Sequence, residues 1–117
     1  MRAQILSLES NNHLDWESFA RYQSPDPYDD FGWFRVTIGA SDLDGGNDFQ
    51  VCVATPRADG RIKRSGSVPG ILVDRFDADT VSKAVRERVE SIEGSWEQIV
   101  DQLRRFMRWE YEGMAGS

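Results

Sequence analysis

The stretch WFRVTIGASDLDGGNDFQVCVAT, residues 33–55, decides the fold class. Apolar and polar side chains alternate over residues 33–39 and again over residues 49–55, which is the pattern of strands with one buried face. Between them lie several Gly and Asp residues, which favour a reversal of the chain. We therefore expect an antiparallel hairpin whose buried face carries Phe34, Val36 and Ile38 on one strand and Phe49, Val51 and Val53 on the other.

Two further strands are predicted outside the hairpin. Residues 2–8 read RAQILSL, and simple alternation places Leu6 and Leu8 on one face and Ile5 on the other. Residues 71–76 read ILVDRF and supply a fourth, short strand. The sheet would then have about four strands.

The segments that connect these strands carry turn and cap signals. Residues 12–22 predict a short helical turn with Asn12 as its cap. Residues 56–70 are rich in Gly, Ser and basic residues and predict a loop, with a tight turn at Asp59 and Gly60.

The last third of the chain changes to helical spacing of its apolar residues. Residues 77–94 predict an amphipathic helix capped by Asp77 or Asp79. Residues 95–111 predict a second one, which begins with Ser95 and a Gln three residues later, a capping-box arrangement. Both Trp residues of this segment are expected to anchor that second helix.

Strands followed by helices indicate an α+β fold. We expect an antiparallel sheet of about four strands with two C-terminal amphipathic helices packed on one face. A chain of 117 residues suits a single domain over residues 1–117. Residues 113–117 are expected to form a flexible tail.

The charge of the chain is unevenly distributed. The formal net charge is −6, and residues 1–60 carry all of this excess of acidic over basic side chains. A folded surface of this kind repels nucleic acid, because its phosphates are also negative, and suits a basic protein partner. An acidic surface also keeps a protein soluble without any partner.

Cysteine usage and the N-terminus indicate the compartment. Cys52 is the sole cysteine, so no internal disulfide can form, and the N-terminal stretch has no apolar core typical of a secretion signal. No apolar run approaches the roughly 20 residues that span a bilayer. We expect a cytoplasmic protein that does not associate with membranes.

The residues that could carry chemistry do not form a known catalytic or metal-binding pattern. His13 and Cys52 are each unique, yet no nucleophile signature surrounds the cysteine, which in mid-strand is typical of a small buried residue. Residues 42–53 resemble a calcium loop in part, but position 12 is a valine where a Glu is required. No phosphate-binding loop is present. We expect neither enzymatic activity nor a metal or cofactor.

A recognition surface is the remaining candidate site. Residues 13–33 interleave aromatic and acidic side chains, a composition that suits binding of a protein with a basic surface. We interpret Phe19, Phe31 and Trp33 as cover for the sheet. The predicted partner-binding residues are Asp15, Glu17, Tyr22, Asp26, Tyr28, Asp29 and Asp30.

Several short motifs resemble one family along nearly the whole chain. The most specific are Glu93-Gly94 followed by Trp96-Glu97, and the terminal stretch WEYE at residues 109–112. The weaker ones are DDFGW at residues 29–33 and a Thr-Pro pair after the second strand of the hairpin. In this order they resemble the immunity protein 8 family of bacterial polymorphic toxin systems.

The resemblance implies a small, non-enzymatic protein that binds and neutralises a cognate toxin encoded beside it. Stoichiometric occlusion of the toxin would be the mechanism. Two alternatives stay open from the residues alone: an adaptor or regulatory module for a non-toxin partner, and an enzyme that uses Cys52 and His13. The oligomeric state is not indicated.

Overall fold

The computed structural model describes residues 1–41, 45–64, 66 and 69–109. The predicted tail and the last three residues of the WEYE motif lie outside these residues. Strands and helices follow the order β1 Ala3–Ser10, α1 Trp16–Arg21, β2 Phe31–Ala40, β3 Asn47–Ala54, η1 Pro56–Ala58, α2 Asp59–Arg64, β4 Ile71–Leu72, α3 Ala78–Glu90, α4 Trp96–Leu103 and β5 Arg108–Trp109. Every helix in this part of the chain is too short or too polar to cross a bilayer.

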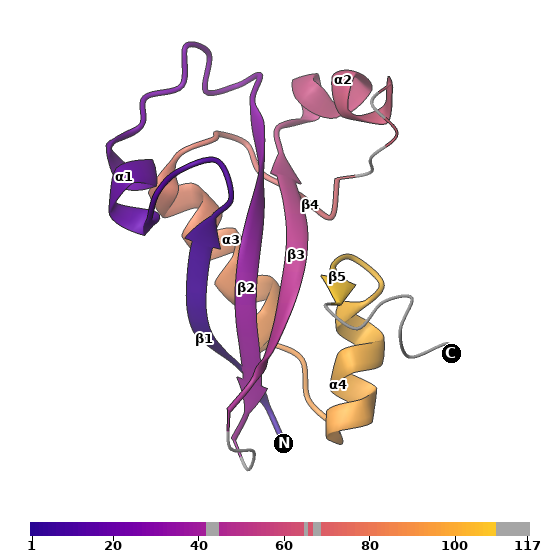
Figure 1. Cartoon of the computed structure of the whole chain (residues 1–117). Coiled ribbons are helices and arrows are strands. Elements are labelled where there is room, and N and C mark those ends of the chain that lie inside the picture. The colour runs from indigo at the N-terminus through magenta and orange to yellow at the C-terminus, as the bar shows by residue number, and fades with distance from the viewer. Residues whose placement is uncertain (42–44, 65, 67–68, 110–117) are drawn as a thin grey trace.

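The architecture is α+β, as predicted (Figure 1). The sheet has strand order β1-β2-β3-β4, and β5 also pairs with β3. The predicted hairpin is confirmed, because β2 and β3 pair antiparallel from Phe31 opposite Ala54 to Ile38 opposite Asn47. The β4 strand is much shorter than the stretch predicted and pairs parallel to β3.

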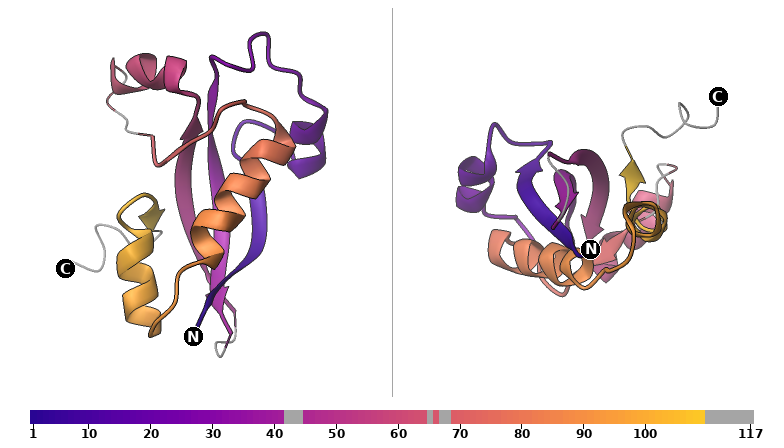
Figure 2. Two further views of the ribbon diagram at one scale, coloured as in Figure 1. Left: turned by 180° about the vertical axis from the view of Figure 1, so that it is seen from behind. Right: turned by 90° about the horizontal axis from the view of Figure 1, so that it is seen from below.

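The two C-terminal helices pack on one face of the sheet, also as predicted. Helix α3 lies across β1 and β2, and α4 lies nearer to β5 (Figures 1 and 2). Their buried residues meet the inward face of the hairpin in one core, whose fully buried members include Phe34, Val36, Ile38, Phe49, Val51, Val53, Val81, Val85, Val89, Ile99 and Leu103. The alternation in the sequence therefore marked the correct face.

The side chains of strand β1 do not point to the faces of the sheet that the prediction gave them. A register shift between Ile5 and Ser7 interrupts the alternation. As a result Leu6 is 53% exposed, whereas Leu8 is buried and Ile5 packs against the core. The extra residue in a β-bulge changes which side chains point inward, and simple alternation does not anticipate it.

The segment predicted as a loop with a tight turn is helical instead. Ala58 in η1 and Ile62 in α2 are buried against Cys52 and Ala54 of β3, with Trp33 packed beside them. This second cluster lies on the face of the sheet opposite α3. Apolar residues four apart on a helix share one face, so the pair can cover this end of the sheet.

The second C-terminal helix ends sooner than predicted. Helix α4 stops at Leu103, and Trp109 lies in β5 opposite Phe49. The indole Nε1 of Trp109 donates a hydrogen bond to the Asn47 side-chain oxygen over 3.2 Å. The free edge of β3 thus binds residues that were predicted to extend the helix, and only Trp96 anchors α4.

Helix caps agree with the sequence at two of the three helix starts for which it predicts one. Asp77 caps α3, and Ser95 with Gln98 forms the predicted capping box of α4. The cap of α1 is Asp15, and the predicted Asn12 cap was wrong. The Asp15 carboxylate accepts a hydrogen bond from the backbone N–H of Ser18, three residues later, over 2.8 Å. Asn12 lies too far from the first turn of α1 to accept this bond.

Candidate partner-binding surface

The predicted partner-binding residues gather at one end of the sheet. Most of them lie in the loop 22–30, which joins α1 to β2 and passes beside η1 and α2 (Figure 1). Two prolines, Pro25 and Pro27, hold the backbone of this loop extended. We call this segment the acidic loop.

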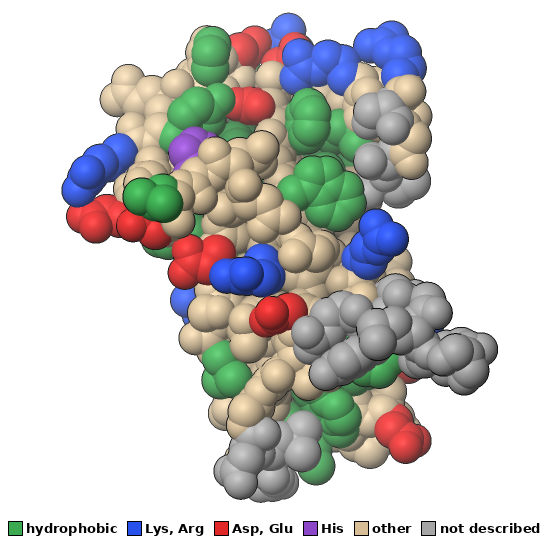
Figure 3. All heavy atoms as spheres, viewed as in Figure 1, with side chains coloured by type: hydrophobic (Ala, Val, Ile, Leu, Met, Phe, Trp, Pro, Cys, Tyr) green, Lys and Arg blue, Asp and Glu red, His purple; other side chains and the backbone are tan. Residues whose placement is uncertain are grey.

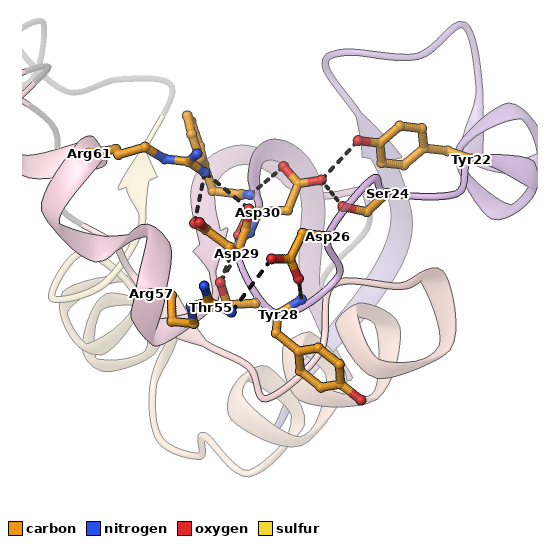
Figure 4. Close-up of polar contacts among 10 residues, drawn as sticks. Tyr22, Ser24, Asp26, Tyr28, Asp29, Asp30, Thr55, Arg57 and Arg61 are labelled. Carbon is orange, nitrogen blue, oxygen red and sulfur yellow. Dashed lines mark hydrogen bonds and ion pairs between the residues drawn. The ribbon is translucent and has the colours of Figure 1, made fainter.

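Asp30 holds the acidic loop closed on itself. Its carboxylate accepts hydrogen bonds from the Tyr22 hydroxyl at 2.8 Å, the Ser24 hydroxyl at 2.5 Å and the Phe31 backbone N–H at 2.8 Å (Figure 4). Burial, the hydrogen bond to Asp30 and the charge of that carboxylate together raise the pKa of Tyr22, outweighing a smaller lowering by Ser24. The tyrosine therefore remains a neutral donor at physiological pH.

The backbone of Asp30 is tied to the end of β3. Its N–H donates to the Thr55 hydroxyl over 3.1 Å, and the Thr55 N–H donates to its carbonyl oxygen over 3.0 Å. Thr55 is fully buried. A buried hydroxyl with satisfied hydrogen bonds fixes its neighbours in place, so the acidic loop is anchored to the sheet.

Two acids of the loop are paired with arginines of the neighbouring helical segment. Asp26 lies 3.5 Å from Arg57, and Asp29 lies 3.1 Å from Arg61 (Figure 4). The Tyr28 N–H also donates to the Asp26 carboxylate over 3.0 Å. These two carboxylates are therefore offset by positive charge within the molecule, and their structural role is to bind the loop to η1 and α2.

The two predicted residues of α1 lie apart from this network. Hydrogen bonds from the backbone and side chain of Ser18 lower the pKa of Asp15 despite a small opposing effect of burial. Glu17 is exposed and pairs with Arg21 one helical turn away at 2.7 Å. Both residues stabilise α1, and both are exposed.

Aromatic side chains stand out of this end of the molecule. Tyr28 is 51% exposed, Phe31 is 38% exposed and Tyr22 is 37% exposed. Figure 3, which has the view of Figure 1, shows apolar side chains among acidic and basic ones over the upper half of the molecule. Phe31 was predicted to cover the sheet and does not, while Phe19 is buried as predicted.

One pocket beside the acidic loop was missed by sequence reasoning. It has a volume of about 290 Å³ and is lined in part by His13, Tyr22, Phe31, Gly32 and Phe76. The signal that could have indicated it is Gly32, because a glycine inside a strand marks a close approach of other groups. A Cβ on this residue would lie 3.0 Å from the Phe76 ring.

The residues considered for catalysis do not form a catalytic arrangement. Cys52 is buried opposite Trp33, and burial raises the pKa of its thiol to about 11. A buried thiol of this pKa is a poor nucleophile at neutral pH. Within the described residues, no three His, Cys, Asp or Glu side chains are grouped to hold a metal ion.

The motif at Glu93 and Gly94 has a structural role. The Gly94 N–H donates to the Met1 carbonyl oxygen over 2.9 Å, and Arg2 pairs with Glu93 at 3.0 Å. The Ala3 N–H also donates to the Ile92 carbonyl oxygen over 3.0 Å. The motif thus joins the start of β1 to the connection between α3 and α4.

Comparison with known proteins identifies the family. The model of the family described as Immunity protein 8 matches residues 3–114. No curated protein and no solved structure matches the chain. Because the match covers nearly the whole sequence and includes the motifs that tie the helices to the sheet, the chain belongs to the immunity protein 8 family, whose members neutralise toxins of polymorphic toxin systems and are typically non-catalytic.

Proposed function

We propose that this protein neutralises its cognate toxin by forming a stoichiometric complex in which the acidic loop and α1 cover the active site of the toxin. The observation that carries the proposal is the fixed shape of the loop. Asp30 alone holds Tyr22 and Ser24 through its carboxylate and Thr55 through its backbone. The contact residues are those predicted from the sequence, Asp15, Glu17, Tyr22, Asp26, Tyr28, Asp29 and Asp30.

A fixed loop suits tight binding because little order has to be created on association. Ordering a flexible side chain at an interface costs roughly 0.5–1.5 kcal/mol. Tyr22 and Tyr28 are rigid aromatic side chains, and the first is already held by a hydrogen bond. They would supply the docking energy, as exposed aromatic anchors commonly do.

The acids of the site divide into two roles in this proposal. Asp26 and Asp29 hold the loop through Arg57 and Arg61, so they contribute shape. Glu17 is likewise paired, with Arg21, whereas Asp30 has no cationic partner among the described residues and contributes negative charge. A toxin with a basic surface at its active site would be attracted by this charge.

The experiment is a binding and inhibition assay with the toxin domain encoded beside this gene. We expect a complex of one copy of each protein and loss of toxin activity on complex formation. An adjacent gene product that is harmless when expressed alone, combined with stable binding to a housekeeping protein, would instead indicate the adaptor function.

We place this interaction in the cytoplasm. The support is the single reduced cysteine, because Cys52 is buried and free. Fractionation of the producing cells, with the periplasmic and cytoplasmic fractions probed separately, tests this placement. Recovery mainly from the periplasm would contradict it.

A further inference from the structure

The pocket beside the acidic loop is walled by aromatic rings from separate parts of the chain. The His13 ring lies 5.0 Å from the Tyr22 ring and 5.3 Å from the Phe19 ring, measured between centroids. Phe76 closes another side, 5.6 Å from Phe19. Gly32 also lines the pocket, and because it has no side chain the Phe76 ring can approach its backbone closely. All residues that line the pocket belong to the described part of the chain, and none of them is a Lys or an Arg.

A carboxylate without a cationic partner in the described part of the chain is hydrogen-bonded to one of the residues that line this pocket. Of the three acids at the end of the acidic loop, Asp26 and Asp29 are paired with arginines, but Asp30 accepts hydrogen bonds from neutral groups only. One of those donors is the hydroxyl of Tyr22, which lines the pocket. The charge is therefore available to a cation that enters beside Tyr22.

A free hydrogen-bond acceptor faces the same space. The side-chain oxygen of Asn12 lies 3.7 Å from the position that a Cβ on Gly32 would occupy, and Asn12 also lines the pocket. In the described part of the chain this oxygen has no hydrogen-bond donor. A carbonyl oxygen and a carboxylate near several ring faces form the set of groups that binds a guanidinium or ammonium group.

We infer that this pocket binds one arginine or lysine side chain of the cognate toxin, with the cation between the aromatic rings and the Asp30 carboxylate. A volume of about 290 Å³ fits a single side chain better than a larger ligand. The molecule already contains a comparable contact, since the Arg61 guanidinium lies 5.9 Å from the Phe31 ring centroid. This inference rests on the proposed function, because it names the group of the toxin that the site takes.

The test uses N-acetyl-arginine-methylamide as a probe, with the citrulline analogue as its neutral control of the same shape. Both are titrated into the isotope-labelled protein while the ring resonances of His13, Tyr22 and Phe31 are recorded. A single side chain binds weakly, so we expect saturation with a dissociation constant of roughly 10–100 mM for the arginine probe only. Equal shifts with both probes, or none with either, would overturn the inference.

Two variants locate the response. Asp30→Asn keeps an acceptor for Tyr22 but removes the charge, and should weaken arginine binding about tenfold. Leu72→Ala changes an exposed residue of β4 that does not line the pocket, and should leave the response unchanged.

The toxin domain separates failure of this inference from failure of the proposed function. If the wild-type protein binds the toxin and Asp30→Asn binds it about tenfold less tightly, the cation site is supported. If Asp30→Asn and wild type bind the toxin equally, the cation site is wrong although the complex stands. If the wild-type protein does not bind the toxin, the proposed function fails, whatever the arginine probe shows.

Discussion

The hydroxyl of Tyr22 donates a hydrogen bond to the carboxylate of Asp30 over 2.8 Å, across the full length of the acidic loop. This bond joins the end of α1 to the start of β2 and fixes the segment that we propose contacts the toxin. It also places an exposed aromatic ring beside an acid that has no cationic partner among the described residues. The stability of the loop and its binding chemistry therefore depend on the same residue.

Removal of the Asp30 carboxylate should destabilise the protein. Asp30→Ala leaves Tyr22, Ser24 and the Phe31 N–H without their acceptor, and we expect the free energy of unfolding to fall by about 1–3 kcal/mol. Urea unfolding measures this, and amide exchange across residues 22–30 should become faster. Asp101→Ala is the control: it breaks an exposed pair with Arg105 at 3.6 Å and should cost less than about 0.5 kcal/mol. Equal effects of the two variants would contradict the role given to Asp30.

Two glycines should respond to alanine in opposite directions. Gly94 has φ of 140°, and a Cβ there would lie 2.7 Å from the Gln98 Oε1 atom of the capping box, so Gly94→Ala should cost about 1–3 kcal/mol. Gly60 lies in α2 with open space around it, so Gly60→Ala should stabilise the protein by about 0.5–1 kcal/mol. Thermal unfolding of both variants measures these changes in stability. A stabilising effect of Gly94→Ala would contradict the backbone conformation described between α3 and α4.

The cap of α3 predicts a pH dependence. Burial tends to raise the pKa of Asp77, but hydrogen bonds from Thr80 and the nearby Arg75 outweigh it, so the pKa lies below the ordinary value of 3.8. Because folding lowers this pKa, the stabilisation is complete above pH 3.8 and is lost as the pH falls through the folded-state pKa.

Asp77→Ala should therefore cost about 1 kcal/mol at pH 7. The difference from wild type should shrink as the pH falls below 3.8. Denaturant unfolding at pH 7, 5 and 3 provides the comparison. A difference that grew on acidification would have the wrong sign.

Cys52 should be unreactive in the folded protein. The thiol is 1% exposed, and burial raises its pKa to about 11, so little thiolate is present at pH 8. A thiol-specific reagent should label it only when the protein is unfolded. Cys52→Ala should still neutralise the toxin in full. Rapid labelling of the folded protein, or loss of neutralisation in this variant, would reopen the catalytic alternative.

The exposed tyrosine of the acidic loop should contribute to toxin binding. Tyr28 is 51% exposed, and Tyr28→Ala should weaken the complex about tenfold or more if this ring is buried by the toxin. Leu72→Ala is the matched control, since Leu72 is similarly exposed at 57% but lies in β4 near α3. Calorimetric titration of each variant with the toxin domain gives the ratio. Equal losses for the two variants would remove the loop from the interface.

The central fold could be predicted from the sequence because local periodicity and burial agree there. The alternation in β2 and β3 and the valines of α3 each define one face, and the capping box marks the start of α4. The two-residue strands β4 and β5 carry no such period. These two strands form because their backbone groups pair with β3. A pattern within a few residues does not show such a pairing between segments distant in the sequence.

Helix α2 could not be predicted from local sequence preferences either. Asp59 and Gly60 favour a tight turn locally, yet the burial of Ile62 against Ala54 and Cys52 stabilises a helix. Tertiary contact therefore outweighed local preference. The signal for it was the four-residue spacing of Ala58 and Ile62.

The candidate site could be predicted only as a composition. The alternation of aromatic and acidic side chains identified the acidic loop, but its partners Thr55, Arg57 and Arg61 come from the segment after β3. The pocket could not be predicted for the same reason, because His13, Gly32 and Phe76 meet only in the folded chain.

The most direct test of the account is a titration of the adjacent toxin domain with this protein, with residual toxin activity measured after each addition. A stoichiometric inhibitor predicts a linear loss of activity that ends at one molecule of protein per molecule of toxin. Complete inactivation at a small fraction of one equivalent would reveal an enzyme, and undiminished activity at excess protein would show that this toxin is not its partner; either result would contradict the account.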